Sequence, residues 1–159
     1  MIFQRLNRSN PERVFVVMRA NVANIAADDA VQLELTAASA DGVRIIQPTA
    51  AQLWSFVGIV DAAIANGSYG LVQVYGYRST SRVFQTNTSQ ALGAPLIPVA
   101  AADYMQSVAS TTLYSSFDSS VSVADSTFTN NPIFAVLMET IASSAASATI
   151  SAKVFLRAL

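Results

Sequence analysis

The amino-acid sequence predicts a mainly β protein, a β-barrel or β-sandwich of one domain with an extended N-terminal arm and at most short helices. Three observations predict this class. Short runs rich in β-branched and aromatic residues recur, several of them alternate between apolar and polar residues, and turn signals such as Asp41-Gly42 separate them. The length of 159 residues suits one domain with a hydrophobic core. We therefore place the arm at residues 1–12 and a single β domain at 13–159.

The arm and the first strands differ in composition. In residues 1–12, Asn10 and Pro11 discourage regular structure just before the first apolar run. Three strands are then expected, at 13–20, 31–37 and 41–48. The Asp28-Asp29 pair between the first two is expected in a turn, because adjacent residues of a strand point to opposite faces.

Two stretches alternate clearly enough to predict which residues share a face. In 31–37 we expect Val31, Leu33 and Leu35 to face inward, and Gln32, Glu34 and Thr36 to face outward. In the last stretch, 148–159, one face carries Ile150, Ala152, Val154 and Leu156. The other face carries Ser151, Lys153, Phe155 and Arg157. A strand is predicted at both places.

Residues 48–67 fit two structures. Thr49 and Gln52 have the spacing of a helix capping box, and apolar residues recur after them at helical intervals. Gly58 and the β-branched residues around it favour a strand instead. We predict a strand over about 53–60, followed by a turn through 65–67.

The stretch 69–78, with the sequence YGLVQVYGYR, has one bulky face and one small face. The bulky face carries Tyr69, Leu71, Gln73, Tyr75 and Tyr77, and the small face carries Gly70, Val72, Val74, Gly76 and Arg78. We predict a central strand in which the two glycines let a neighbouring backbone or ring approach closely. The bulky face is expected to fill the core or a subunit contact, and 81–88 is the predicted pairing partner.

The second half of the chain gives weaker signals. Two prolines in 93–101 predict an edge strand or a loop. We expect a short helix at 103–110, weak β structure at 119–131 and a buried segment at 132–142.

Composition indicates a protein whose surface is covered by other protein. Apolar residues make up 52% of the chain and charged residues 12%, roughly half the usual charged share. Eight of the nine basic residues are arginine, the cation that interfaces tolerate best, although a high-GC genome would produce the same bias. The net charge of −1 predicts no nucleic-acid partner, and no membrane partner is expected.

The residue types argue against catalysis. The sequence contains no cysteine and no histidine, which excludes thiolate zinc sites, disulfides and histidine-based triads. No phosphate-binding loop or calcium loop pattern occurs. We therefore expect no enzyme activity, no cofactor and no metal site. A stacking platform built from Trp54 and the tyrosines is the remaining alternative to core packing for those residues, and it would make the protein a ligand-binding β-module.

Two segments resemble small virion structural proteins of tailed bacteriophages. In the first, 41–78, a Phe-x-Gly-Ile pattern is followed by Ile-x-x-Gly-x-x-Gly-x-Val-Gln-Val-x-Gly. The matching residues are Phe56, Gly58 and Ile59, then Ile64, Gly67, Gly70, Val72, Gln73, Val74 and Gly76. The second segment, 135–159, is similar to the last hairpin of those proteins through Ala135, Leu137, Glu139, Lys153, Val154, Leu156 and Leu159. Together the two segments cover about two fifths of the chain.

The resemblance implies a capsid decoration, or cement, protein. Such proteins are β-rich and often trimeric, and they bind the outer face of an icosahedral head where capsid subunits meet. It therefore implies the major capsid protein and other copies of this chain as partners, and the outer surface of the virion as the location. A tail or neck component is the alternative within virions. The residues we expect at protein interfaces are Phe3, Arg5 and Arg8 in the arm, and Tyr77, Arg78 and Arg82 where a central hairpin is expected to turn.

Deleting residues 1–10 should leave the β domain folded and weaken assembly. The arm alternates apolar and basic residues, with Phe3, Arg5, Leu6 and Arg8. This pattern suits an arm that lies on a neighbouring subunit or in a groove of the capsid, where the arginines meet carboxylates. Circular dichroism would check the fold, and binding to purified heads would check assembly. Unchanged assembly would mean that the arm makes no essential contact.

Overall fold

A computed structural model of the chain describes residues 12–36, 41–50, 52–86, 88–107 and 133–158. These residues form eleven strands and one 3₁₀ turn. The elements are β1 (Arg13–Ala20), β2 (Ala30–Leu33), β3 (Arg44–Ile46), η1 (Leu53–Ser55), β4 (Phe56–Val60), β5 (Tyr69–Arg78), β6 (Arg82–Gln85), β7 (Pro95–Pro98), β8 (Met105–Ser107), β9 (Ala135–Leu137), β10 (Ala148–Ser151) and β11 (Val154–Arg157). The mainly β class predicted from the sequence is confirmed.

The first five strands close into a barrel. Their order is β1-β3-β2-β4-β5, and β5 pairs back onto β1 over seven residue pairs from Arg13–Gly76 to Arg19–Tyr69. β1 and β3 run parallel, and the other neighbours in the barrel are antiparallel. The structure therefore realises the barrel alternative and not the sandwich.

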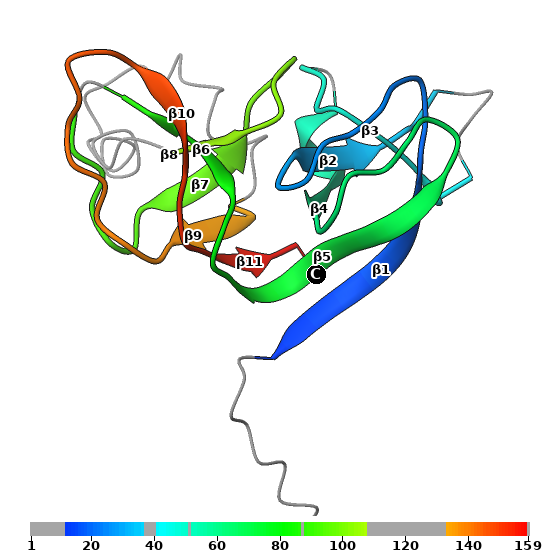
Figure 1. Ribbon diagram of the computed structural model, residues 1–159, viewed down its shortest axis with the longest axis horizontal. Helices are drawn as coiled ribbons and strands as arrows, with labels where there is room; N and C mark the ends of the chain where they lie inside the picture. The colour runs from blue at the N-terminus through cyan, green and yellow to red at the C-terminus, as the bar shows by residue number, and fades with distance from the viewer. Residues whose placement is uncertain (1–11, 37–40, 51, 87, 108–132, 159) are drawn as a thin grey trace, which may run out of the picture.

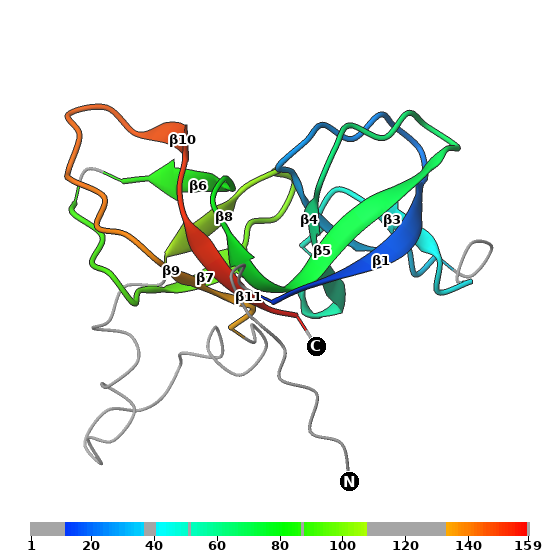
Figure 2. The same ribbon diagram turned by 60° about the horizontal axis from the view of Figure 1, so that its bottom comes forward.

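The remaining strands form a curled sheet that continues from β5. β11 pairs with the last part of β5, and the order continues β9, β7, β8, β6 and β10. Only Ala152 and Lys153 separate β10 from β11, so the two outer strands of this curled sheet are consecutive in the chain. In Figures 1 and 2 the barrel lies on the right and the curled sheet on the left, joined along β5 and β11.

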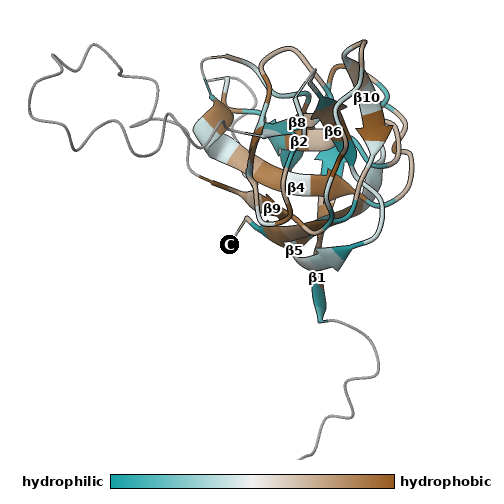
Figure 3. Ribbon diagram, turned by 90° about the vertical axis from the view of Figure 1, so that its left-hand side faces the viewer, coloured by the Kyte–Doolittle hydropathy of each residue, from teal (hydrophilic) through white to brown (hydrophobic). Residues whose placement is uncertain are grey.

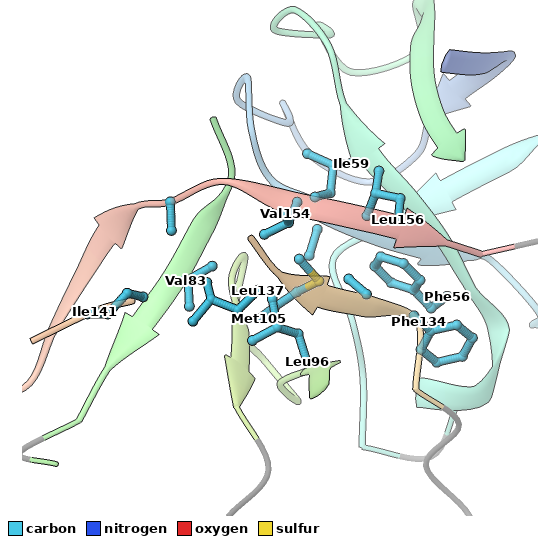
Figure 4. Packing of buried hydrophobic residues seen from close by; sticks show 13 residues of the cluster. Phe56, Ile59, Val83, Leu96, Met105, Phe134, Leu137, Ile141, Val154 and Leu156 are labelled. Atoms are coloured by element: carbon cyan, nitrogen blue, oxygen red, sulfur yellow. The ribbon is translucent and has the colours of Figure 1, made fainter. Parts of the chain in front are cut away.

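Two hydrophobic cores result, and strands β2 and β4 contribute to both. The barrel core contains Met18, Ala20, Ile25, Val31, Ile45, Val60, Ile64 and Val72. The second core lies against the outside of β2 and β4 and is shown in Figure 4. There Phe56 and Ile59 of β4 meet Phe134 and Leu156, and the Phe56 and Phe134 rings are 4.8 Å apart. Figure 3 shows hydrophobic residues along β9 and much of β4, as these shared cores require.

A β-bulge explains the irregular apolar pattern in β4. Val31 pairs with Gly58, while the next residue, Gln32, pairs with Phe56, so Val57 is an extra residue in the ladder. An extra residue shifts the following side chains to the other face. Phe56 thus joins Ile59 in the second core at a spacing of three, which resembles a helix in the sequence. The predicted strand at 53–60 is confirmed from Phe56 onward, after the short η1 turn.

β5 is the central strand, as predicted, because β1, β4 and β11 all pair with it. Close approach at its two glycines is also confirmed. A Cβ at Gly70 would lie 2.5 Å from the Ile64 side chain, and one at Gly76 would overlap the main-chain carbonyl of Glu12. The small face of β5 lines the interior, with Val72 and Val74 buried, while Tyr69 and Leu71 of the bulky face are exposed.

Several expected pairings were wrong. The predicted partner of β5 at 81–88 forms β6, which pairs with β10 and β8 instead. The segment 93–101 contains β7, an inner strand between β8 and β9, whose prolines stand at its two ends. The predicted helix at 103–110 is not found in its described part, where residues 103 and 104 form a bend and strand β8 follows.

Other expectations about single residues had mixed outcomes. Gln32 and Glu34, predicted to face outward, are both buried. Gln32 is buried because β2 has a core on each side, and Glu34, just after β2, turns its carboxylate back to accept the N–H of Thr36 at 3.0 Å. Gln32 binds Thr49 through both ends of its amide. The predicted final strand is confirmed as β10 and β11, with Ala152, Val154 and Leu156 on the buried face. The stretch 119–131 lies outside the described residues.

Replacing Gly76 by alanine should destabilise the fold more than the same change at Gly93. Both glycines have positive φ, +98° and +87°, so alanine costs about 1–2 kcal/mol at either position for the left-handed backbone. Only at Gly76 would the new Cβ also overlap a neighbouring strand, and we expect a total loss of about 3 kcal/mol or more. Urea unfolding of both variants would measure the difference. Equal losses would show that β1 can move away from Gly76.

Candidate protein-interaction surface

The residues predicted at interfaces fall into two groups. Phe3, Arg5 and Arg8 lie outside the described residues. Tyr77, Arg78 and Arg82 lie at or just after the end of β5, where the chain leaves the barrel and enters the curled sheet. This segment is a crossover between the two halves and not the turn of a hairpin, because β5 and β6 do not pair.

Arg78 is buried, with 5% of its surface exposed, and all five of its N–H groups have acceptors inside the chain. Nε and Nη2 donate to Asp28 Oδ1 at 3.2 and 2.7 Å. The second Nη2 hydrogen is directed at the carbonyl of Val60, 2.9 Å away. Nη1 donates to Asp61 and to the buried amide oxygen of Gln73, at 3.1 and 3.3 Å. Arg78 therefore acts inside the protein, tying the ends of β4 and β5 to the link between β1 and β2.

Arg82 connects the barrel to the curled sheet. Its Nη1 donates to Asp29 at 3.0 Å and to Asp103, which precedes β8. The main-chain N–H of Ala30 reinforces this connection by donating to the Asp103 carbonyl at 2.9 Å. We call the six charged residues of this region the junction cluster: Asp28, Asp29, Asp61, Arg78, Arg82 and Asp103. About a third of the Arg82 side chain is exposed. Arg82 therefore connects the barrel to the curled sheet and remains accessible to solvent, whereas Arg78 is buried.

The Asp28-Asp29 turn positions the carboxylates of the cluster, and its prediction as a turn is confirmed. Asp28 has a φ of +67°, a left-handed conformation that aspartate adopts more readily than most residues. Thr80 also donates to Asp28 Oδ1, at 3.0 Å. Asp29 Oδ2 accepts the N–H of Ala26 at 2.8 Å, so the turn is closed by its own side chain.

Burial raises the pKa of the Asp29 carboxyl above 3.8, and the neighbouring Asp103 carboxylate adds to the rise. Hydrogen bonds from Ala26 and Arg82 offset part of it. The exposed Asp41 behaves oppositely. The N–H groups of Val43 and Arg44 hold the pKa of its carboxyl below 3.8.

Tyr77 is half-buried at the seam between the two halves. It pairs with Phe155 of β11 across the ladder. Phe155 in turn packs edge-on against Tyr75, with ring centroids 5.4 Å apart. Tyr77 therefore contacts the chain's own strands while keeping part of its surface accessible.

An exposed apolar surface lies on the outside of the barrel, on neighbouring strands β1 and β5. Val17 is 61% exposed, and its cross-strand partner Leu71 is 47% exposed. Tyr69, two residues from Leu71, is 64% exposed and pairs with Arg19. We call Val17, Tyr69 and Leu71 the β1–β5 face. The alternation in 69–78 showed that Tyr69 and Leu71 share a side, but the sequence does not specify which side of a barrel strand faces out.

Trp54 is also exposed, at 59%, on the η1 turn before β4. The ring pairs found among the described residues are Phe56–Phe134, Tyr75–Phe155 and Phe84–Tyr104. Trp54 is thus accessible but is not part of a stacked aromatic pair there. Tyr104 packs on Phe84 with ring centroids 5.2 Å apart.

Within the described ranges, no group of three or more acidic, histidine or cysteine side chains is arranged to hold a metal ion. No described helix has the length and apolar character needed to cross a membrane.

In comparisons with known proteins, no family model matches the chain, and no curated protein matches it either.

Replacing Arg78 by methionine should lower the free energy of unfolding by about 3 kcal/mol. This is the lower end of the cost of breaking a buried ion pair, because Asp28 and Asp61 retain partial access to water. The matched control is Arg44→Met, which removes an ion pair from a more exposed arginine, 28% against 6% for Arg78, and should cost less than about 1 kcal/mol. Urea denaturation would measure both. Similar losses for the two variants would mean that the junction cluster contributes no more than a surface pair.

Replacing Asp29 by asparagine should change how stability depends on pH. A carboxyl whose pKa is raised in the folded state contributes stability below its unfolded pKa and loses it as the pH rises through the folded value. The stability of the natural protein relative to Asp29→Asn should therefore fall as pH rises from about 3.8 toward neutrality. Asp41→Asn should give the opposite trend, because the pKa of Asp41 is lowered. Urea unfolding at several pH values would test both signs, and the same trend in both variants would contradict the assignment.

Proposed function

We propose that this protein is a capsid decoration, or cement, protein that binds the outer face of an icosahedral phage head and stabilises contacts between major capsid subunits. The β1–β5 face is the observation that carries the proposal. It provides exposed aliphatic and aromatic side chains on a closed barrel, which is a rigid support for a docking surface. The resemblance of segments 41–78 and 135–159 to small virion proteins supports the major capsid protein as the proposed partner.

The β1–β5 face has the chemistry of an interface centre. Val17, Leu71 and Tyr69 remain about half exposed or more in the single chain, and covering each with a partner would contribute about 1 kcal/mol from apolar burial. Exposed Tyr69 also offers a hydroxyl that can bond at the rim, as tyrosine often does at interfaces. Arg19 beside it has its Nε bonded to the carbonyl of Gly67 at 3.0 Å, which holds the guanidinium near this face.

Three side chains are too few for a whole interface, since specific complexes bury about 800 Å² on each partner. The N-terminal arm leads into β1, one of the two strands of the face, and supplies further apolar and basic residues. Arm and face together form the proposed contact with the major capsid protein and with other copies of the chain in a trimer. Arg82 is retained as a rim residue, while Arg78 serves inside the protein.

A decoration protein of this kind stabilises the shell by mass action. It binds a surface that spans several capsid subunits, and this surface exists only when they are assembled. The equilibrium therefore shifts toward the closed shell, and symmetry repeats the contribution at each equivalent position. The proposal requires no covalent step.

A ligand-binding β-module is a second candidate, because Trp54 and Tyr69 are accessible as that function needs. The absence of a stacked partner for Trp54 among the described ring pairs makes it the weaker candidate. Quenching of tryptophan fluorescence by oligosaccharides would identify it.

Purified heads that carry the protein should resist heat better than heads without it, because the bound protein stabilises the assembled shell.

The Leu71→Arg variant should bind heads at least about tenfold more weakly than the natural protein. Tenfold corresponds to about 1.4 kcal/mol, the scale of one buried aliphatic side chain plus the cost of burying a charge. The matched control is Leu92→Arg, which changes a leucine of 63% exposure just before β7 and should bind normally.

Light scattering of the same protein preparations should return the mass of a trimer. Equal heat resistance of heads with and without the protein would overturn the decoration role. Binding to tails in place of heads would favour the neck or tail alternative.

A further inference from the structure

Strand β10 has an open edge within the part of the chain that the structure describes. It stands at one end of the sheet order, while β1, at the other end, closes onto β5 and pairs with β3 only at Arg19 and Ala20. β10 pairs with β6 along one side through all four of its residues. Its residues Ala148, Thr149 and Ser151 are exposed.

The register shows which main-chain groups of β10 face outward. Ser151 lies opposite Arg82, and the next N–H, that of Ala152, donates to the carbonyl of Ser81. In an antiparallel pair, bonded and non-bonded residue pairs alternate. Ile150 and Ala148 therefore bond to β6, whereas the N–H and C=O groups of Thr149 and Ser151 point away from it, toward the open edge.

This edge is short, at four residues, but it carries no charge, no proline and no bulge. Natural edges are blunted by lysine, proline, inward charges or bulges. From Thr140 to Ala152 the sequence contains no charged residue, no proline and no glycine, and β10 has a regular register with β6. The nearest charge, Lys153, is paired with Glu139.

We propose that β10 pairs with β10 of a second copy, antiparallel and about a two-fold axis at Ile150. The spacing of the outward groups makes the edge self-complementary. Thr149 of each copy would lie opposite Ser151 of the other and exchange two main-chain hydrogen bonds, which gives four in all. Ile150 would face Ile150 of the second copy in the closely spaced non-bonded position, where cross-strand side chains touch.

Side-chain chemistry favours a second copy as the occupant. A self-paired edge places identical side chains near one another, so any charge in β10 would oppose its own image, and β10 has none. Ile150 is partly buried and packs on the second core, so pairing would extend that core across the contact. The opposing threonine and serine hydroxyls are small enough to fit and able to hydrogen bond.

This contact is separate from the β1–β5 face and does not depend on the proposed function. If copies form trimers through that face, pairing at β10 would link one trimer to the next across a local two-fold axis. Four residues bury far less than the roughly 1,200 Å² of a stable complex, so we expect the contact by itself to be weak. Covalent trapping is the suitable test.

The chain contains no cysteine, so a single introduced thiol reports one contact. We expect Ile150→Cys in the full-length protein to form a disulfide-linked dimer under mild oxidation, since opposed non-bonded residues have Cα atoms about 4.5 Å apart. Ser89→Cys, an exposed position outside both β10 and the β1–β5 face, controls for random collision and should give severalfold less dimer. Thr149→Cys should also give less, because its two copies would not be opposite each other.

A second pair of variants tests the main-chain bonds. Adding Thr149→Pro to Ile150→Cys removes an outward N–H without touching a bond to β6, and it should abolish the dimer. Adding Thr149→Ala should preserve it. Circular dichroism would confirm that each variant is folded. Equal cross-linking at 89 and 150, or a dimer that survives Thr149→Pro in folded protein, would overturn the proposal.

Discussion

The fold depends on a buried guanidinium. Arg78 stands where β5 leaves the barrel, and a charged group in that position is tolerated only if each of its N–H groups has an acceptor. Its acceptors come from the β1–β2 link, from the end of β4 and from β5 itself. Satisfying one side chain therefore requires three parts of the barrel to be in place together. Arg82, four residues later, extends the same set of carboxylates to the curled sheet.

Sharing of strands makes the two cores one structure. β4 sends Val60 into the barrel and, because of the bulge at Val57, sends both Phe56 and Ile59 into the second core. β5 similarly pairs with β4 over its middle and with β11 over its end. Removing the curled sheet would expose the apolar outside of β4, and removing the barrel would expose the apolar residues of the curled sheet that pack on it.

Local pattern predicted the strands better than their partners. The bounds of β1 and β5 agree with the sequence because each is a long β-rich run ended by turn residues. Pairing is set by contacts distant in sequence, so the partner of β5 and the inner position of β7 were missed. The same limit applies to Arg78, whose carboxylate partners lie 50 and 17 residues away. Nothing in its immediate neighbours distinguishes it from the exposed arginines, and nothing in 69–78 indicated that Tyr69 and Leu71 face solvent.

The position of β10 and β11 in the chain has a consequence for the order of folding. All five barrel strands lie within residues 13–78 and can pair as soon as that stretch has left the ribosome. The curled sheet must wait, because β6 needs β10 and β9 needs β11, both after residue 147. During synthesis the outside of β4 stays uncovered while about 70 further residues are added, at roughly 5–20 residues per second. This interval of seconds is when the chain is most exposed to aggregation, and a chaperone that binds apolar strands would act on it then.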